Sequence, residues 1–522
     1  MEFLAPLMFA GLVVFLLLGY PVAFSLAANG LLFAAIGIAT GVFGWDLLQA
    51  LPERVYGIVG NQTLLAIPFF TLMGLILERS GMAEDLLDTI GQLFGPLRGG
   101  LAYAVIFVGA LLAATTGVVA ASVIAMGLIS LPIMLRYGYD KRVASGIIAA
   151  SGTLAQIIPP SLVLIILADQ LSASVGDMYK GAILPGLGLV ALYALYVFGI
   201  SLFRPSAVPA LPLSARTLRG AALWTRALTT LLPPLLLIFL VLGTIFLGIA
   251  TPTEGGAMGA VGALIMAFSR RRLNLRLLRQ AMDSTAKLAT FVLFILIGST
   301  VFSFTFNAGD GHIWVEHLFD KLPGGQLGFL LVVNLLVFVL GCFIDFFEIA
   351  FIVVPILAPV ADKMGIDLIW FGVILAMNLQ TSFLTPPFGF ALFYLRSVAA
   401  KQDYKDRVTG RMIPAVTTAQ IYKGSIAFII LQLIMVAAII AYPQLVSGGI
   451  VKGETIDADK ALETMGLPDP VPAEEAASAP PAGASEPEAG ASEPAEAAMA
   501  DEDPMKALEE SMKKDAGGAK KP

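Results

Sequence analysis

The 522-residue chain has one cysteine, Cys342, and two histidines, and only 13% of its residues are charged. A single cysteine excludes a disulfide framework and a cysteine-based metal site. The sequence also lacks HExxH, GxSxG, Walker and GxGxxG motifs. No constellation of nucleophile, base, zinc ligand or nucleotide loop therefore points to an enzyme. Without an ATP-binding motif, any transport must draw on an ion gradient or on a partner protein.

What the chain has in abundance is apolar sequence, because 57% of its residues are hydrophobic. Runs of about 17 or more apolar residues are long enough to cross a bilayer as helices. We therefore predict an all-α polytopic membrane protein. The apolar segments are 4–18, 22–41, 62–78, 101–135, 143–168 and 183–203 in the first half, and 230–249, 253–269, 288–306, 328–361, 370–395 and 424–443 in the second.

Two stretches, 132–161 and 359–388, look like copies of one another. Each is a short polar loop followed by an apolar helix that two consecutive prolines interrupt. A proline pair removes backbone donors and leaves carbonyls that lipid cannot satisfy. Two kinked helices in a structural bundle are one reading, but paired broken helices favour a transporter's binding site. The matching residues, 227 positions apart, are Pro132 and Pro359, Gly138 and Gly365, Asp140 and Asp367, and the pairs Pro159-Pro160 and Pro386-Pro387.

Lys and Arg gather in four loops, which the positive-inside rule assigns to the cytoplasm. This orientation requires segments 101–135 and 328–361 each to enter and leave the membrane on the same side. We therefore predict two re-entrant hairpins, the first opening to the cytoplasm and the second to the periplasm, with both termini periplasmic. If each hairpin were instead two full membrane spans, the loops on either side of it would still lie on the same side of the membrane. The four loops are 136–142, 204–226, 270–287 and 396–423.

These elements predict two inverted repeats and a tail. Residues 446–522 are acidic, rich in Ala, Glu and Pro, and predicted to be disordered. Amphipathic segments at 82–94, 270–283 and, more weakly, 45–59 are expected to lie at the membrane interface. The first repeat, 1–210, contains hairpin 101–135 and broken helix 143–168, and the second, 211–445, contains hairpin 328–361 and broken helix 370–395.

Carbonyls freed at the breaks, with nearby hydroxyls and amides, offer the oxygen ligands that a small hard cation such as Na+ prefers. Some of these hydroxyls could instead bond back to their own helix. The candidate cation ligands are Thr115, Thr116, Gly117, Gly152, Pro159, Asp345, Asn378, Thr385 and Pro386. The candidate substrate contacts are Thr153, Ser161, Gln380, Thr381, Ser382 and Phe388.

Asp345 is an ionisable residue in an otherwise apolar stretch, which points to function. If the hairpin tip reaches only the interface, Asp345 is a solvated loop residue. Its carboxyl could also carry a proton in place of Na+. No Lys or Arg lies within a broken span, so positive helix N-termini at the breaks are expected to bind a substrate carboxylate.

Five stretches resemble the large membrane subunit of tripartite ATP-independent periplasmic (TRAP) transporters, within the ion-transporter superfamily. They fall in both halves, so the resemblance covers about 1–445 and excludes the tail. The stretches are AIPFFTLMGLILERSGMAEDLLD (66–88), SGTLAQIIPPS (151–161), GIATPTEGGAMGAVGA (248–263), GCFIDFFEIAFIVVP (341–355) and NLQTSFLTPPFGFALF (378–393).

The resemblance implies an elevator-type carrier in a bacterial inner membrane, coupled to sodium. It implies a small membrane subunit and a periplasmic substrate-binding protein that delivers an organic acid anion, with lipid around the chain and no nucleic acid. Asp345 matches the acidic position of the family's second hairpin. A stand-alone carrier of the same superfamily is an alternative, and a channel is a further one, although the spans offer few repeated polar faces.

Overall fold

The computed structural model describes residues 4–320, 322–406 and 408–450. These residues are helical almost throughout, apart from the antiparallel pair β1 (Tyr404–Lys405) and β2 (Met412–Ile413). Six of the described helices are long and apolar enough to cross a membrane. The predicted all-α polytopic architecture is confirmed.

The N-terminal part confirms the predicted helix at 82–94. Within α6, Leu86, Leu87 and Ile90 are buried on one face, as the amphipathic pattern requires. Helix α4 buries none of its residues fully, although Ile58 packs against the core and the helix contacts α14. The elements are α1 (Leu4–Leu17), α2 (Val22–Ala39), α3 (Asp46–Gln49), α4 (Leu51–Val59), η1 (Thr63–Leu65), α5 (Ala66–Arg79) and α6 (Met82–Leu93).

The two predicted hairpins and broken helices follow in the same order in each half. The first set is α7 (Gly100–Thr116), α8 (Val119–Arg136), α9 (Lys141–Thr153), η2 (Leu154–Gln156) and α10 (Leu162–Gln170). The second set is α16 (Gly325–Leu340), α17 (Phe346–Glu348), the π-helical segment η5 (Ile349–Val353), α18 (Val354–Lys363), α19 (Leu368–Phe383) and α20 (Phe390–Val398). Re-entrance, the opposite orientation of the hairpins and the repeat boundaries stay predictions.

One sequence expectation is wrong. Residues 270–283 do not form a separate interfacial helix, because α14 runs without interruption from Leu275 to Ala308. The Asn274 side chain caps its start by accepting a hydrogen bond from Leu277 N at 2.8 Å. No glycine or proline between 275 and 297 breaks the helix, and buried Leu277 and Ala281 continue its packed face.

The remaining elements connect and flank the two sets. The tail was predicted to begin at 446, but α22 extends to Ser447 and Val446 is buried. Residues 451–522, on which the rest of that prediction falls, lie outside the described residues. The elements are α11 (Val175–Phe203), η3 (Pro205–Ala207), η4 (Leu213–Ala215), α12 (Gly220–Phe246), α13 (Pro252–Ser269), α15 (Gly311–Asp320), α21 (Thr418–Ala441) and α22 (Gln444–Ser447).

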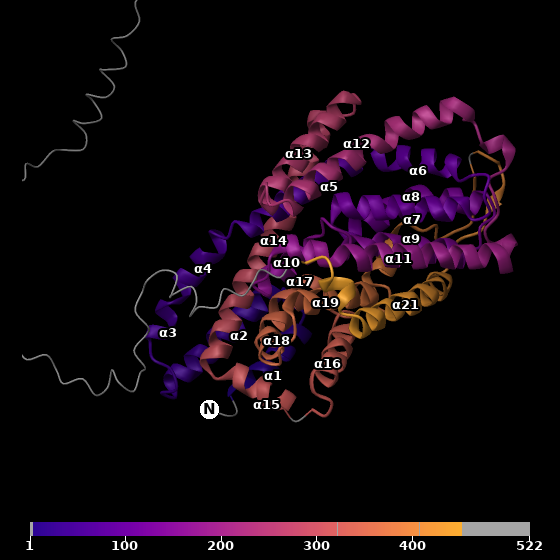
Figure 1. Ribbon diagram of the computed structural model, residues 1–522. Helices are drawn as coiled ribbons and strands as arrows, with labels where there is room; N and C mark the ends of the chain where they lie inside the picture. The colour runs from indigo at the N-terminus through magenta and orange to yellow at the C-terminus, as the bar shows by residue number, and fades with distance from the viewer. Residues whose placement is uncertain (1–3, 321, 407, 451–522) are drawn as a thin grey trace, which may run out of the picture. The chain divides into compact units, whose positions relative to one another are not determined.

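Helices α7, α8, α9, α11 and α21 lie side by side (Figure 1). Glycines allow the closest crossing: a Cβ atom on Gly146 of α9 would lie 2.7 Å from the carbonyl carbon of Gly424 on α21. Helix α10 is buried on all sides, with residues 162–168 at most 1% exposed. The broken helices therefore form the centre of the packed core.

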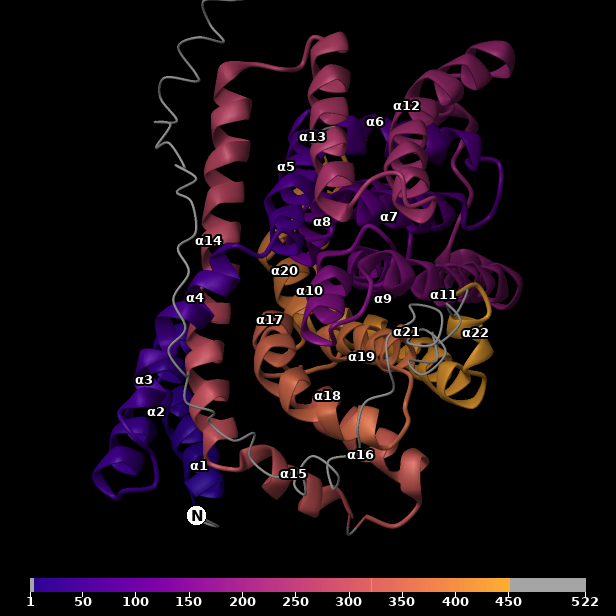
Figure 2. The same ribbon diagram turned by 60° about the vertical axis from the view of Figure 1, so that its left-hand side comes forward.

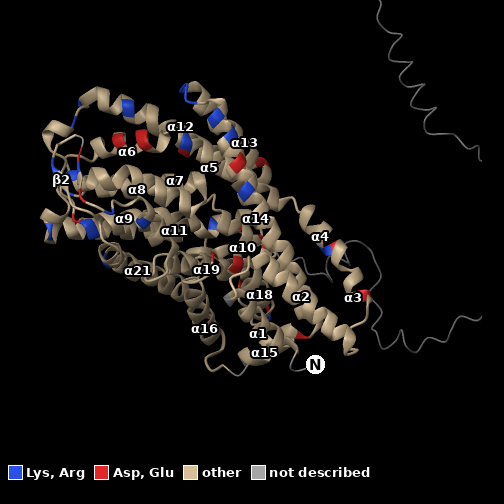
Figure 3. Ribbon diagram, turned by 180° about the vertical axis from the view of Figure 1, so that it is seen from behind, with Lys and Arg blue, Asp and Glu red and all other residues tan. Residues whose placement is uncertain are grey.

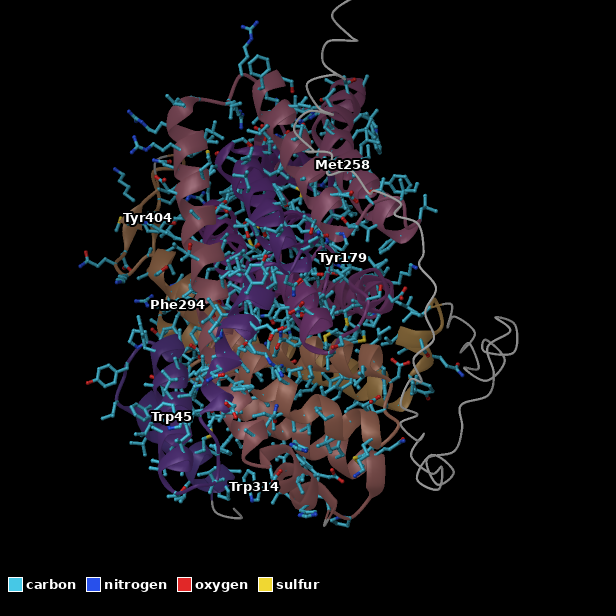
Figure 4. The ribbon with its side chains drawn as sticks, turned by 90° about the vertical axis from the view of Figure 1, so that its left-hand side faces the viewer. Trp45, Tyr179, Met258, Phe294, Trp314 and Tyr404 are labelled. Carbon is cyan, nitrogen blue, oxygen red and sulfur yellow. The ribbon has the colours of Figure 1, made fainter. Side chains whose placement is uncertain are left out.

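The long helix α14 packs against α2 and α5, apart from the five helices α7, α8, α9, α11 and α21 that lie side by side (Figure 2). Its contact with α2 is also made by small residues, because a Cβ atom on Gly30 would lie 2.8 Å from the Val301 carbonyl oxygen. In Figure 4, Tyr179 lies inside the packed helices, whereas Trp45 lies at the edge and is 71% exposed.

Charged residues collect away from the apolar middles of the helices. Lys and Arg gather near β2 and the start of α9 (Figure 3). There the Arg136 side chain forms an ion pair with Asp406 at 2.9 Å. The Asp406 carboxylate also accepts hydrogen bonds from the backbone and hydroxyl of Thr409 at 2.7 and 2.6 Å. These bonds, followed by those from Arg136, lower the pKa of Asp406 to about 2.

Candidate functional site

Both broken helices begin with the same local structure. Asp140 caps α9 and Asp367 caps α19, and each carboxylate accepts hydrogen bonds from the backbone N–H groups two and three residues ahead. Before each cap lies a glycine with positive φ, Gly138 at 86° and Gly365 at 72°. Capping satisfies exposed helix donors, and glycine adopts this backbone at least cost. The matched residues thus have the same structural role in each half.

Both helices stop at their proline pairs, as predicted. The Pro159-Pro160 and Pro386-Pro387 peptide bonds are both cis. At the first break the Ser161 hydroxyl donates to the Gln156 carbonyl at 2.7 Å. At the second, the Tyr422 hydroxyl donates to the Pro387 carbonyl at 2.9 Å. Side chains therefore take up some of the carbonyls that the breaks release from helical bonding.

The tip of the first hairpin touches the first break. Gly117, between α7 and α8, has a φ of 59°, and a Cβ atom there would lie 3.3 Å from Leu162 N and 3.5 Å from Pro160 O. The Thr116 and Ser122 hydroxyls are hydrogen-bonded at 2.8 Å across the tip. The structure therefore brings the tip residues, Gly117 among them, to the point where α10 begins.

The first hairpin also packs closely on α9. A Cβ atom on Gly152 would lie 3.1 Å from the Val123 Cα of α8, and one on Gly109 of α7 would lie 3.1 Å from the Ser151 carbonyl oxygen. Close helix packing therefore explains why residue 152 is a glycine. Its role as a cation ligand, through its carbonyl, stays a prediction.

The tip of the second hairpin touches the second break in turn. The Phe343 and Phe388 rings lie 5.0 Å apart between centroids. A Cβ atom on Gly341 would lie 2.9 Å from Ser382 Cβ at the end of α19. Phe388 is 46% exposed, so it stands at the mouth of this region. The predicted substrate residues Ser382 and Phe388 are therefore both in contact with the hairpin tip.

Asp345 begins the short helix α17 within this tip. Its Oδ1 atom accepts a hydrogen bond from Phe346 N at 2.7 Å, and Glu348 Oε2 accepts one from Asp345 N at 3.2 Å. Asp345 is half-buried, so it is not a fully solvated loop residue. The two carboxylates lie within one helical turn, and when both are ionised a bound cation would relieve their repulsion.

The two halves meet at Thr153 and Gln380. Gln380 Nε2 donates to Thr153 Oγ1 at 3.4 Å, and both residues are 0% exposed. They are separated by 227 positions, the offset that relates the two repeats. Equivalent residues of two copies can touch only where they lie near the axis that relates the copies. This contact therefore puts the ends of α9 and α19 together in the core.

Most of the hydroxyls predicted to contact the cation or the substrate bond back to their own helix. They donate to backbone carbonyls at 2.8–3.0 Å, so their hydrogens are used while oxygen lone pairs remain. Asn378 instead reaches another helix, since its Nδ2 donates to the Asn334 carbonyl of α16 at 2.6 Å. The hydroxyls in question are those of Thr115, Thr153, Thr381, Ser382 and Thr385.

Sequence reasoning missed two buried amides in this region. Gln156 is 0% exposed, and neither its side-chain oxygen nor its side-chain nitrogen has a hydrogen-bond partner among the described residues. The side-chain oxygen of Asn334 is also buried without a partner. Such groups are costly unless a ligand or water satisfies them. An amide alone in an apolar run, as in SGTLAQIIPPS, is the signal that could have identified Gln156.

The donor set suits an alkali cation better than a transition metal. No group of three His, Cys, Asp or Glu side chains in the described part of the chain could hold a metal ion. The predicted ligands are instead carbonyl, hydroxyl, amide and carboxylate oxygens, which hard cations prefer. Unpartnered oxygens such as Gln156 Oε1 and Gln380 Oε1 are compatible with this chemistry.

Comparison with known proteins agrees with this architecture. The family model described as "Tripartite ATP-independent periplasmic transporter, DctM component" matches residues 9–445. The C4-dicarboxylate TRAP transporter large permease protein DctM of Pseudomonas aeruginosa is 32% identical over 361 residues, covering 68% of this chain and 82% of the relative. The sialic acid TRAP transporter large permease protein SiaM of Vibrio cholerae is 30% identical over 385 residues, covering 73% and 86%.

A solved structure shares the fold at low sequence identity. The YdaH transporter of Alcanivorax borkumensis has a TM-score of 0.53 at 16% identity, over 77% of this chain and 90% of that one. The family is one of transporter permeases and not of enzymes. The chain is a multi-pass membrane protein that belongs to the DctM family, the large permease component of tripartite ATP-independent periplasmic transporters.

Proposed function

We propose that this chain is the large permease of a sodium-coupled importer of an organic acid anion in a bacterial inner membrane. It works with a small membrane subunit and with a periplasmic substrate-binding protein. The names of its relatives specify C4-dicarboxylates and sialic acid, which are carboxylates, and isethionate, which is a sulfonate. Their common chemistry supports an organic acid anion here, and the first two relatives support a carboxylate.

The observation that carries the proposal is the meeting of the two broken helices at Thr153 and Gln380. Each helix break is covered by the tip of one hairpin, and the residues between them are buried. Such interrupted helices are where transporters hold substrate and ion near the midplane. Alternating access of the elevator type would carry this unit past α14 and its neighbours.

Sodium coupling is supported by the kind of donors at the site. In the first half, Thr115, Thr116 and Gly117 lie at the tip beside the break at Pro159. Oxygens of these residues, of Gly152, and of the second-half set would hold the cation. Its positive charge would help to retain a substrate carboxylate next to it. The second-half set is Asp345, Asn378, Thr385 and Pro386.

Substrate would lie against polar groups at the ends of α9 and α19, and Phe388 would form an apolar wall. The N-termini of α10 and α20 add the positive ends of helix dipoles. The contacts that we assign to substrate are those of Thr153, Ser161, Gln380, Thr381, Ser382 and Phe388.

Uptake into proteoliposomes tests the proposal. The chain is co-reconstituted with a small subunit and a substrate-binding protein of the same family from its own source, and labelled succinate and sialic acid are offered with and without a sodium gradient. Uptake that needs sodium and the binding protein is the expected result. Uptake without the binding protein would indicate a stand-alone carrier, uptake driven by a pH gradient would replace sodium by a proton, and gradient-independent flux would indicate a channel.

A further inference from the structure

A cavity of about 370 Å³, lined by both polar and apolar residues, lies between α14, α4, α10 and the second hairpin. The polar residues that line it include Arg54, Gln170, Ser299, Ser303 and Asn307. None of them belongs to the site described above. Phe351 and Pro355 of the second hairpin also line it.

The polar lining on α14 is a stripe along one helical face. Ser299, Ser303 and Asn307 are spaced four residues apart, so they project from the same side of the helix. Polar groups in an apolar span face protein or a wet cavity and avoid lipid. The Ser303 hydroxyl is buried without a hydrogen-bond partner among the described residues.

Arg54 supplies the charge. It comes from α4, and its guanidinium carbon lies 5.4 Å from the centre of the Phe304 ring on α14, a cation–π arrangement that holds the side chain over the cavity. It is the one charged residue among those that line the cavity. Asp169 keeps its negative charge, but its two oxygens accept hydrogen bonds from Asn61 at 2.7 Å and Gln170 at 2.9 Å, and Asp169 is not among the residues that line the cavity.

The available donors can be counted from these contacts. The Ser299 hydroxyl donates to the Phe351 carbonyl and is not free for a ligand, whereas the Gln170 amide uses one of its two hydrogens on Asp169. The remaining donors around the cavity are Arg54, Thr300, Asn307 and the second Gln170 N–H. A guanidinium with neutral donors beside it matches a carboxylate, which accepts several hydrogen bonds and pairs with Arg in a bidentate manner.

We propose that this cavity binds the carboxylate of the transported anion, with Arg54 as its charged partner. This inference rests on the proposed transport function and adds a binding group that the broken helices lack. A ligand held here would touch both α14 and the second hairpin, whose tip covers the second break. The anion would thus bind at Arg54 either before it enters the site between the broken helices or after it leaves that site.

Two measurements test the site, and the first does not depend on transport. Cys342 is the only cysteine, so Cys342→Ala gives a background in which Thr300→Cys places one thiol on the cavity wall. The anionic reagent sulfonatoethyl methanethiosulfonate should modify this thiol about tenfold more slowly after Arg54→Gln, because attraction to the guanidinium is lost. The cationic trimethylammonium reagent should not be slowed. Arg54→Lys should retain the anionic preference.

The second measurement is sodium-driven uptake of whichever labelled acid the wild type accepts. Arg54→Gln should raise KM roughly 10- to 100-fold, the usual cost of losing a charged hydrogen-bond partner, with less effect on the maximal rate. Arg271→Gln is the matched control, since Arg271 is exposed between α13 and α14. If Arg54→Gln does not fold, the Thr300→Cys protein that keeps Arg54 is used instead. High salt must then abolish the faster reaction of its thiol with the anionic reagent, because salt screens the charge of Arg54.

The outcomes separate the two proposals. An anionic reagent preference that requires Arg54 supports the cavity as an anion site even if no uptake by the assembled transporter is found, in which case the transport proposal alone fails. Equal effects of Arg54→Gln on both reagents, or a KM equal to that of the wild type, overturn the carboxylate site.

Discussion

Replacing Gln380 by leucine separates a ligand role from a structural one. Its amide nitrogen makes a long hydrogen bond, 3.4 Å to Thr153, and its side chain also interacts with the Tyr193 hydroxyl, while its side-chain oxygen is buried without a partner at hydrogen-bond distance. A net hydrogen bond contributes about 0.5–1.5 kcal/mol, and a bond this long lies at the weak end. Relief of the unpartnered carbonyl offsets that loss, since such a group costs about 1–3 kcal/mol.

Gln380→Leu should therefore change stability by no more than about 1 kcal/mol, or roughly 1–2 °C in Tm for a chain of this size. Uptake should nevertheless fall at least about tenfold, because the variant has no oxygen for substrate and no donor for Thr153. Thermal unfolding in detergent and sodium-driven uptake in proteoliposomes are the two measurements, made on the same preparation.

Asn29→Leu is the matched control. Asn29 is also 0% exposed, with its amide nitrogen bonded to the Met8 carbonyl at 2.8 Å and its oxygen without a partner, but it lies on α2 outside the broken helices. Its uptake should follow the amount of folded protein. Normal uptake by Gln380→Leu would refute the ligand role, and a large loss of Tm would show that the amide is structural.

Three further perturbations follow from the geometry. Gly117→Ala should cost about 1–2 kcal/mol for its left-handed backbone and press a methyl group onto Leu162, so uptake should fall while the protein still purifies as a folded species; unchanged uptake would contradict the close tip contact. Asp345→Asn should weaken the dependence of uptake on sodium, and an unaltered sodium response would remove Asp345 from the cation site. Asp406→Asn should lower Tm at pH 7, where the wild-type carboxylate is ionised and held by Thr409 and Arg136. Because the folded pKa of Asp406 is depressed to about 2, this advantage is present above pH 4 and disappears as the pH falls toward 2. A difference in Tm that persists unchanged at pH 2–3 would refute that assignment.

The hydroxyl candidates show where sequence reasoning was incomplete. The sequence indicates which residues at the breaks carry oxygen atoms, but not how each hydroxyl hydrogen is used. In the structure Thr381 and Ser382 donate to carbonyls of their own helix, whereas Asn378 reaches α16. That distinction depends on rotamers and on the distance to a neighbouring helix, neither of which the order of residues encodes.

The prediction of an interfacial helix at 270–283 was wrong for a related reason. Its amphipathic pattern is real, but the same pattern is compatible with an interfacial helix and with the first turns of a long span. Packing decided between them, because Leu277 and Ala281 are buried against neighbouring elements in line with the rest of α14. Periodicity reports which face is apolar, and it does not report what covers that face.

Local chemistry by itself determined the apolar helices, the breaks and the caps. Prolines cannot donate a backbone hydrogen bond, Asp140 and Asp367 cap the helices that follow them, and these effects act over a few residues. Only the tertiary structure decided that Thr153 meets its counterpart Gln380, and that Arg54 lies beside the polar stripe of α14. Those contacts join residues more than 200 positions apart, so they arise from how helices pack and not from any pattern along the chain.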